Sequence, residues 1–123
     1  MEGKKILIIE DDTFLQGLAA NKLQSEGLEV NTASTGEAAL TELSNQTYDA
    51  IILDLMLPDI SGFDILKQIR ERETNNKIPI LIFSNLSDDK DIKRGLELGA
   101  TDYLVKANFT LDELAEKVMK VFK

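Results

Sequence analysis

Short runs of aliphatic residues alternate along the chain with longer stretches in which apolar residues recur every three or four positions. The short runs predict buried strands, and the longer stretches predict amphipathic helices. The expected strands span residues 5–9, 29–33, 50–53, 80–83 and 103–106. The expected helices span residues 14–23, 38–43, 63–69, 88–98 and 114–122, with a polar connection at 72–77. This alternation predicts a parallel sheet with helices on both faces, a single doubly wound α/β domain over residues 1–123.

Capping residues mark the ends of several of these helices. Asp12 or Thr13 is expected to cap the first helix, and Gly27 is expected to end it. The segments Ser34–Glu37 and Thr110–Glu113 each have the spacing of a capping box, in which a hydroxyl and a carboxylate satisfy two backbone N–H groups. Helix starts are therefore expected at these two positions.

Charge and composition narrow the range of functions. The net charge is −8, which disfavours direct contact with nucleic acid or anionic membranes and is compatible with protein partners and divalent cations. The absence of histidine excludes histidine general bases, histidine zinc sites and a phosphohistidine on this chain. The absence of cysteine excludes a disulfide scaffold. No apolar run approaches the ~20 residues of a membrane span. With no signal-peptide pattern in residues 1–5, the cytoplasm is the expected location.

Chemically reactive side chains follow four of the five expected strands. Glu10 and Asp11 follow the first strand, Asp54 the third, Ser84 the fourth, and Lys106 closes the fifth. In a parallel sheet the carboxyl ends of the strands share one edge, where ligands bind. If the strand order is 2-1-3-4-5, as in flavodoxin-like (βα)5 folds, the first and third strands are neighbours and the three carboxylates crowd together.

This set of side chains points to phosphoryl transfer. Adjacent carboxylates repel one another unless a proton or a cation is present, and an all-oxygen site suits Mg²⁺. Lys106 adds a mobile ammonium, and Ser84 adds a hydroxyl donor. Because phosphoryl transfer needs its developing charge neutralised, we expect Asp54 to accept a phosphoryl group beside Mg²⁺ and Lys106.

Over essentially its whole length the chain resembles the receiver domain of two-component response regulators. The matching segments beyond the strand ends are residues 57–59 with Gly62, and residues 99–103. The resemblance implies that Asp54 is the phosphorylated residue. It also implies that Mg²⁺ is bound by Glu10, Asp11, Asp54 and the backbone carbonyl of Met56.

The same resemblance implies a switch and its partners. Lys106 corresponds to the invariant lysine, Ser84 to the hydroxyl that moves toward the phosphoryl group, and Tyr103 to the aromatic residue that then rotates inward. The donor is expected to be a histidine kinase or a histidine phosphotransfer protein. The readout is expected at the face of the fourth helix, fifth strand and fifth helix, through an effector domain or a second copy. The family consists of signalling switches and not of enzymes that act on other molecules.

Two positions depart from the family pattern. Ala107 replaces the usual proline after Lys106; because a cis non-proline bond costs about 3 kcal/mol, we expect a trans bond there. Asn85 replaces a small residue and is expected to narrow the entrance to the acceptor site. Met56 and Leu86 are expected to flank the path of water, and their apolar bulk predicts slow hydrolysis of the acyl phosphate.

Three other functions are alternatives to a phosphoryl acceptor. A haloacid-dehalogenase-type phosphatase has an Asp-x-Asp motif after its first strand, whereas this chain has Glu10-Asp11-Asp12 and lacks the length for a cap domain. A flavin binder needs a phosphate loop there, and the same acidic residues would repel phosphate. A receiver-like interaction module without phosphoryl turnover stays open, because of Asn85 and Ala107. A stand-alone receiver and a segment of a longer regulator are both compatible with a last expected helix that reaches the end of the sequence.

Overall fold

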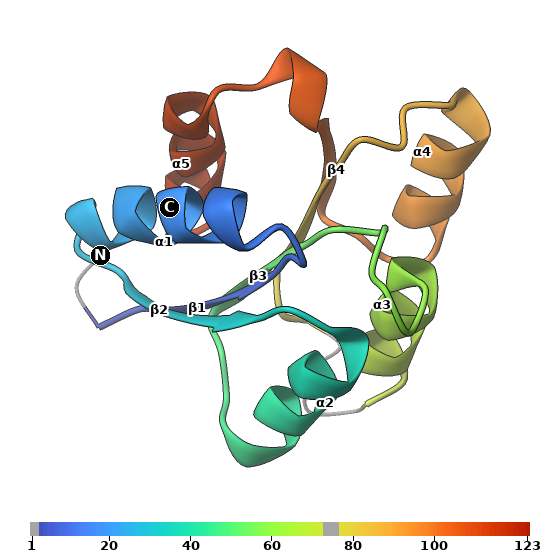
Figure 1. Cartoon of the computed structure of the whole chain (residues 1–123), viewed down its shortest axis with the longest axis horizontal. Coiled ribbons are helices and arrows are strands. Elements are labelled where there is room, and N and C mark those ends of the chain that lie inside the picture. Colours follow the sequence, from blue (N-terminus) through green and yellow to red (C-terminus); the bar gives the residue numbers. More distant parts are fainter. Residues whose placement is uncertain (1–2, 73–76) are drawn as a thin grey trace.

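The computed structural model describes residues 3–72 and 77–123, so most of the polar connection expected at residues 72–77 lies outside the described residues. Five parallel strands form one sheet in the order β2-β1-β3-β4-β5 (Figure 1), which confirms the predicted topology. The strands are β1 (Lys5–Ile9), β2 (Glu29–Ala33), β3 (Ala50–Leu53), β4 (Ile80–Ser84) and β5 (Asp102–Val105). Because β1 pairs with both β2 and β3, the acidic segment after β1 lies beside the end of β3.

Five α-helices cover the two faces of the sheet. They are α1 (Thr13–Ser25), α2 (Gly36–Asn45), α3 (Gly62–Glu71), α4 (Asp89–Glu97) and α5 (Leu111–Lys120). In Figure 1, α1 and α5 lie together above the sheet, and α2 and α3 lie below it. None of the helices in the described part of the chain has the length and apolar character of a membrane span.

Alternate strand residues feed two separate hydrophobic layers. Ile6 and Ile8 of β1 pack with residues of α1 and α5, whereas Leu7 and Ile9 pack with residues of α2 and α3. All four residues of β3 are buried, as its uninterrupted aliphatic run predicts for a central parallel strand. The sheet is therefore a rigid support with both faces covered, and polar side chains gather where its strands end.

Three of the predicted helix caps are present, and one is wrong. Asp12 accepts a hydrogen bond from the Leu15 N–H at 3.0 Å and caps α1, and Gly27 has a φ of 89° beyond its end. Thr110 forms the predicted capping box with Glu113 at the start of α5. The expected box at Ser34–Glu37 does not form, because α2 begins one residue later.

The start of α2 is held by a contact from outside the helix. Thr35 is its N-cap and accepts from the Ala38 N–H at 3.0 Å. The N–H groups of Gly36 and Glu37 donate to the carboxylate of Asp59, at 2.8 and 3.0 Å. These backbone hydrogen bonds lower the pKa of Asp59. A loop residue that lies after β3 therefore accepts from the Glu37 N–H, which the expected capping box would pair with the Ser34 hydroxyl.

The end of β5 also differs from the prediction. The sequence pattern extends the strand to Lys106, but the strand ends at Val105 and Lys106 opens a short 3-10 turn, Lys106–Asn108. All peptide bonds of the described residues are trans, including the bond between Lys106 and Ala107, as expected. Lys106 therefore projects from a turn immediately after the strand.

Candidate functional site

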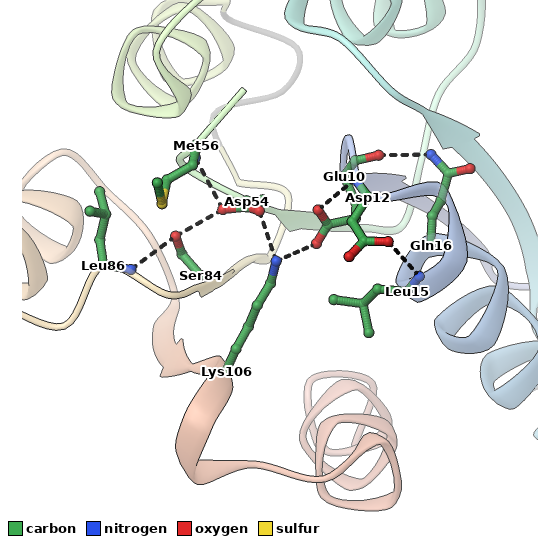
Figure 2. Close-up of polar contacts among 9 residues, drawn as sticks. All are labelled: Glu10, Asp12, Leu15, Gln16, Asp54, Met56, Ser84, Leu86 and Lys106. Carbon is green, nitrogen blue, oxygen red and sulfur yellow. Dashed lines mark hydrogen bonds and ion pairs between the residues drawn. The ribbon is translucent and has the colours of Figure 1, made fainter. Parts of the chain in front are cut away.

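The polar residues that follow β1 and β3 lie side by side at the carboxyl edge of the sheet (Figure 2). The Asp54 N–H donates to the Ile9 carbonyl at 2.9 Å, and the Glu10 N–H donates to the Ala33 carbonyl at 2.9 Å. These bonds continue the parallel ladder one residue past each strand. Both side chains are almost fully buried, each residue being 4 % exposed. The sheet therefore fixes the backbone from which these two carboxylates project.

Asp54 accepts hydrogen bonds at both carboxylate oxygens. Its Oδ1 accepts from the Ser84 hydroxyl at 2.8 Å and from the Met56 N–H at 3.0 Å. Its Oδ2 accepts from the Lys106 ammonium at 2.8 Å. Residues from the loop after β3, from β4 and from the turn after β5 thus converge on one carboxylate, and the sequence predicts Ser84 and Lys106 near it.

Lys106 lies between two carboxylates, 2.6 Å from Glu10 and 2.8 Å from Asp54. Burial raises the pKa of Glu10 to about 6, because the lowering effects of the Lys106 ammonium and the Asp12 N–H do not fully compensate for it. Burial lowers the pKa of Lys106, but its hydrogen bonds and charge pairing with Asp54 and Glu10 outweigh burial and raise it. One buried cation therefore neutralises only part of the negative charge at this edge.

The arrangement suits a hard divalent cation. Oxygen atoms of Glu10, Asp11 and Asp54 lie within 4.8 Å of one another, and Asp11 is exposed to solvent. Mg²⁺ prefers oxygen ligands and usually keeps several of its waters, so a partly open carboxylate cluster fits it. The structure brings together the three expected side-chain ligands. The backbone carbonyl of Met56 as a fourth ligand stays a prediction.

A chain of hydrogen bonds runs from Asp54 to Tyr103 of β5. The Ser84 hydroxyl, which donates to Asp54, accepts from the Leu86 N–H at 3.4 Å, and the Leu86 carbonyl accepts from the Tyr103 hydroxyl at 2.7 Å. The Tyr103 ring is buried and lies against Gly95 of α4, where an added Cβ would come within 3.0 Å of it. Burial, with the charges of Asp91 and Asp54, raises the pKa of Tyr103 to about 12. The Tyr103 ring therefore packs inside the protein, and its rotation on phosphorylation stays a prediction.

The residues expected to control access lie around this site. Asn85 is exposed next to Ser84, and the Met56 side chain is 53 % exposed. Leu86 is half-buried. The sequence assigned Leu86 a role through its side chain alone and missed that its backbone joins Ser84 to Tyr103. Backbone contacts of this kind leave no mark in the residue type.

Sequence reasoning also missed two supporting side chains, Gln16 and Asp59. Gln16 contacts the carbonyl of Glu10 at 2.9 Å, and Asp59 binds the start of α2. A polar residue on a helix is ordinarily solvated, so Gln16 is not singled out by its residue type. Asp59 lies in the segment 57–59 that resembles the family, but that resemblance does not indicate its contact with α2.

Comparisons with known proteins agree with this geometry. The family model described as response regulator receiver domain matches residues 6–119. The response regulator ArlR of Staphylococcus saprophyticus is 39 % identical over 119 residues, which cover 97 % of this chain and 52 % of ArlR. This chain thus spans about half the length of ArlR and of PhoB of Rhizobium meliloti, two curated relatives that it matches.

Solved structures show the same fold. The receiver domain of the Francisella response regulator 1452 superposes with a TM-score of 0.88 at 31 % identity, over 98 % of this chain and 97 % of that one. The chemotaxis protein CheY4 of Vibrio cholerae gives a TM-score of 0.89 at 30 % identity, over 96 % of this chain and 98 % of that one. Both similarities extend over nearly the whole length of the chain.

Proposed function

Because the chain belongs to the response regulator receiver domain family, we propose that it works as a signalling switch in which Asp54 accepts a phosphoryl group. Receiver domains of two-component systems take part in phosphoryl signalling. We propose which residues of this chain carry out each step, and that residues 1–123 form one receiver domain. A single observation supports the assignment above others: Ser84 and Lys106 each donate to a different oxygen of the buried Asp54 carboxylate, at 2.8 Å.

In the proposed reaction a carboxylate oxygen of Asp54 attacks the phosphorus of a phosphohistidine. The P–N bond of the donor breaks, its imidazole leaves, and the chain gains an acyl phosphate. Lys106 is close enough to move from the carboxylate to an equatorial oxygen of the phosphoryl group, and Ser84 can donate to another. Mg²⁺ held by Glu10, Asp11, Asp54 and the Met56 carbonyl would supply further neutralisation of the charge that develops during transfer.

The proposed readout uses the hydrogen-bond chain that leads away from Asp54. An acyl phosphate carries about 1.5 to 2 negative charges in place of the single charge of the carboxylate, and it would draw the Ser84 hydroxyl onto a phosphoryl oxygen. Since Leu86 joins Ser84 to Tyr103, the new position of Ser84 favours one packing of the α4-β5-α5 face over another. An effector domain or a second copy would bind the favoured form. The curated relatives include regulators described as transcriptional, PhoB of Rhizobium meliloti among them.

The phosphoryl donor in this proposal is a histidine kinase or a histidine phosphotransfer protein. The chain contains no histidine, so the phosphohistidine belongs to another molecule. The side chain of Phe14, at the start of α1 and next to the acidic segment, is exposed and apolar, which suits a protein partner beside the acceptor.

The test is labelling of the purified chain with phosphoramidate or acetyl phosphate in the presence of Mg²⁺, followed by intact mass measurement. The wild type is expected to gain the mass of one phosphoryl group, and Asp54→Asn and the wild type in EDTA are expected to gain none. Equal labelling of Asp54→Asn would refute the assignment of the acceptor. Failure of the wild type to be labelled, despite Mg²⁺ binding, would favour the interaction module instead. Asn85 and Ala107 would then be the first positions to replace, with a small residue and with proline.

A further inference from the structure

One amide group on α1 joins three segments of the chain beside the acidic cluster. The Nε2 of Gln16 donates to the backbone carbonyl of Glu10 at 2.9 Å and to the hydroxyl of Ser34 at 3.1 Å. Figure 2 shows the Gln16 amide directed at the Glu10 carbonyl, on the side of Glu10 away from Lys106. Gln16 thus links α1 to the end of β1 and to the loop between β2 and α2.

This contact falls where the sheet stops holding the chain. The Glu10 N–H still bonds to β2, through the Ala33 carbonyl at 2.9 Å, but β1 itself ends at Ile9. Beyond that point the Glu10 carbonyl accepts from a side chain, Gln16, in place of a neighbouring strand. A carbonyl shielded from water and left without a donor is unfavourable, so the Gln16 amide is expected to keep this contact.

The side chain of Glu10 is held as firmly as its backbone. Its Oε2 accepts from the Asp12 N–H at 3.1 Å, and its Oε1 lies 2.6 Å from Lys106. Because each oxygen has a partner, the carboxylate cannot rotate to compensate for a movement of the Glu10 backbone. The direction of the carboxylate therefore depends on the position of that backbone. Asp11 follows immediately, so the same peptide segment also aims the exposed member of the acidic pair.

We propose that Gln16 is a positioning residue that fixes the Glu10–Asp11 segment and thereby sets the affinity of the site for a divalent cation. The neutral amide is not a ligand and does not touch the reacting atoms; it acts through the backbone of Glu10. This proposal rests on the proposed function only in taking Glu10, Asp11 and Asp54 as the metal ligands. Partners that orient metal ligands typically contribute about 10- to 100-fold to metal affinity.

The test compares Gln16→Met with Gln24→Met, both on α1. Methionine has the length of glutamine and lacks the donor, so Gln16→Met removes the hydrogen bonds with little change in volume. Gln24 is exposed near the other end of the helix and is the matched control. Calorimetric titration with MgCl₂, without any phosphodonor, is expected to show about tenfold weaker binding for Gln16→Met and wild-type binding for Gln24→Met.

A second measurement separates positioning from a general loss of structure. The labelling rate of Gln16→Met is expected to need about tenfold more Mg²⁺ for half-saturation and to approach the wild-type rate at saturating Mg²⁺. If Gln16→Met does not fold, Gln16→Asn, which retains an amide on a side chain too short to reach Glu10, is expected to give the same result.

Equal Mg²⁺ affinity in folded Gln16 and Gln24 variants would overturn the proposal. So would a loss of maximal labelling rate with an unchanged Mg²⁺ requirement, because that pattern indicates damage to the acceptor and not to the cation site. Since Mg²⁺ binding is measured without phosphodonor, a wild type that binds Mg²⁺ but is not labelled refutes the proposed function and leaves the comparison of the two glutamines valid.

Discussion

Two lysine-centred clusters lie at opposite ends of β1, and they differ in how far they are shielded from water. At the carboxyl end Lys106 contacts Glu10 and Asp54, and the side chains of this cluster are at most 13 % exposed. At the amino end Lys5 lies 3.2 Å from Glu29 and donates to the Gln46 side chain at 2.7 Å. The side chains of the Lys5–Glu29 pair are 29 % and 62 % exposed.

The difference explains why similar residue types have different uses. In the buried cluster one ammonium faces two carboxylates, and neither water nor salt screens the excess negative charge effectively. That excess favours the binding of a metal ion, which would have to neutralise it before an anionic phosphoryl group approaches. In the exposed cluster one ammonium faces one carboxylate and a neutral amide, and water screens them, so the pair contributes little beyond local order.

The largest expected effect is on the chemistry of the buried cluster. Lys106→Ala removes the cation next to Asp54, so the initial rate of labelling by phosphoramidate at saturating Mg²⁺ is expected to fall at least about 100-fold. Lys5→Ala removes the equivalent charge from the other end of β1 and is expected to leave the rate unchanged. Similar rates for the two variants would show that burial of the lysine does not matter to the reaction.

The second effect is a pH dependence of stability that originates at Glu10. Its pKa is about 6 in the folded protein, against an ordinary value of 4.5, so between these values the folded state binds more protons than the unfolded state. The stabilisation is present below the lower value and is lost as pH rises through the higher one, by about 2 kcal/mol.

Urea unfolding in EDTA, at pH values below and above this interval, measures the loss. Glu10→Gln is expected to show a smaller fall in the free energy of unfolding than the wild type, and Glu29→Gln is expected to follow the wild type. Parallel pH profiles for Glu10→Gln and the wild type would contradict the assignment to Glu10.

A smaller effect concerns the lifetime of the acyl phosphate. Met56 and Leu86 are expected to restrict water at the buried cluster, and replacing both with serine is expected to speed the loss of phosphate several-fold. Mass measurement after removal of the phosphodonor follows the decay. Leu96→Ser is the control, since Leu96 is an exposed apolar residue of α4 that is not expected to restrict water at the buried cluster. An unchanged lifetime in the double variant would refute the role of the two apolar side chains.

The smallest effect is expected at the exposed cluster. Lys5→Met keeps the length of the side chain and removes its charge, and the free energy of unfolding is expected to change by less than about 1 kcal/mol. Raising the salt concentration should reduce even that difference. A fall in the free energy of unfolding as large as the pH-dependent change expected from Glu10 would mean that Lys5 stabilises the fold in spite of its exposure.

The sequence predicted the fold well because its signals were local. Uninterrupted aliphatic runs identify β1 and β3, and the five-fold alternation with helices leaves few topologies for a parallel sheet. The positions of Asp54 and Ser84 at strand ends were predicted for the same reason. The Lys106 contact to two carboxylates follows once the strand order is known.

What the sequence missed depends on contacts between distant segments. Asp59 binds the start of α2 from 23 residues away, and the N-cap of this helix is Thr35 in place of the expected Ser34. The turn that begins at Lys106 ends β5 at Val105, one residue before the predicted end of the strand. Gln16 resembles an ordinary polar helix residue until the backbone it contacts is known. Tertiary structure determines the Asp59 contact, the end of β5 and the Gln16 contact, and none of them can be predicted from the hydrophobic periodicity.

The chain has two tyrosines and no tryptophan, and one tyrosine belongs to each end of the sheet. The Tyr48 hydroxyl donates to Glu42 at 2.8 Å, and its ring lies 6.0 Å from the Lys5 ammonium. The Tyr103 hydroxyl donates to Leu86 at 2.7 Å, in the hydrogen-bond chain from Asp54. Biosynthetic labelling with fluorotyrosine would therefore give two ¹⁹F resonances, one that senses the acceptor edge and one that serves as an internal reference in the same spectrum.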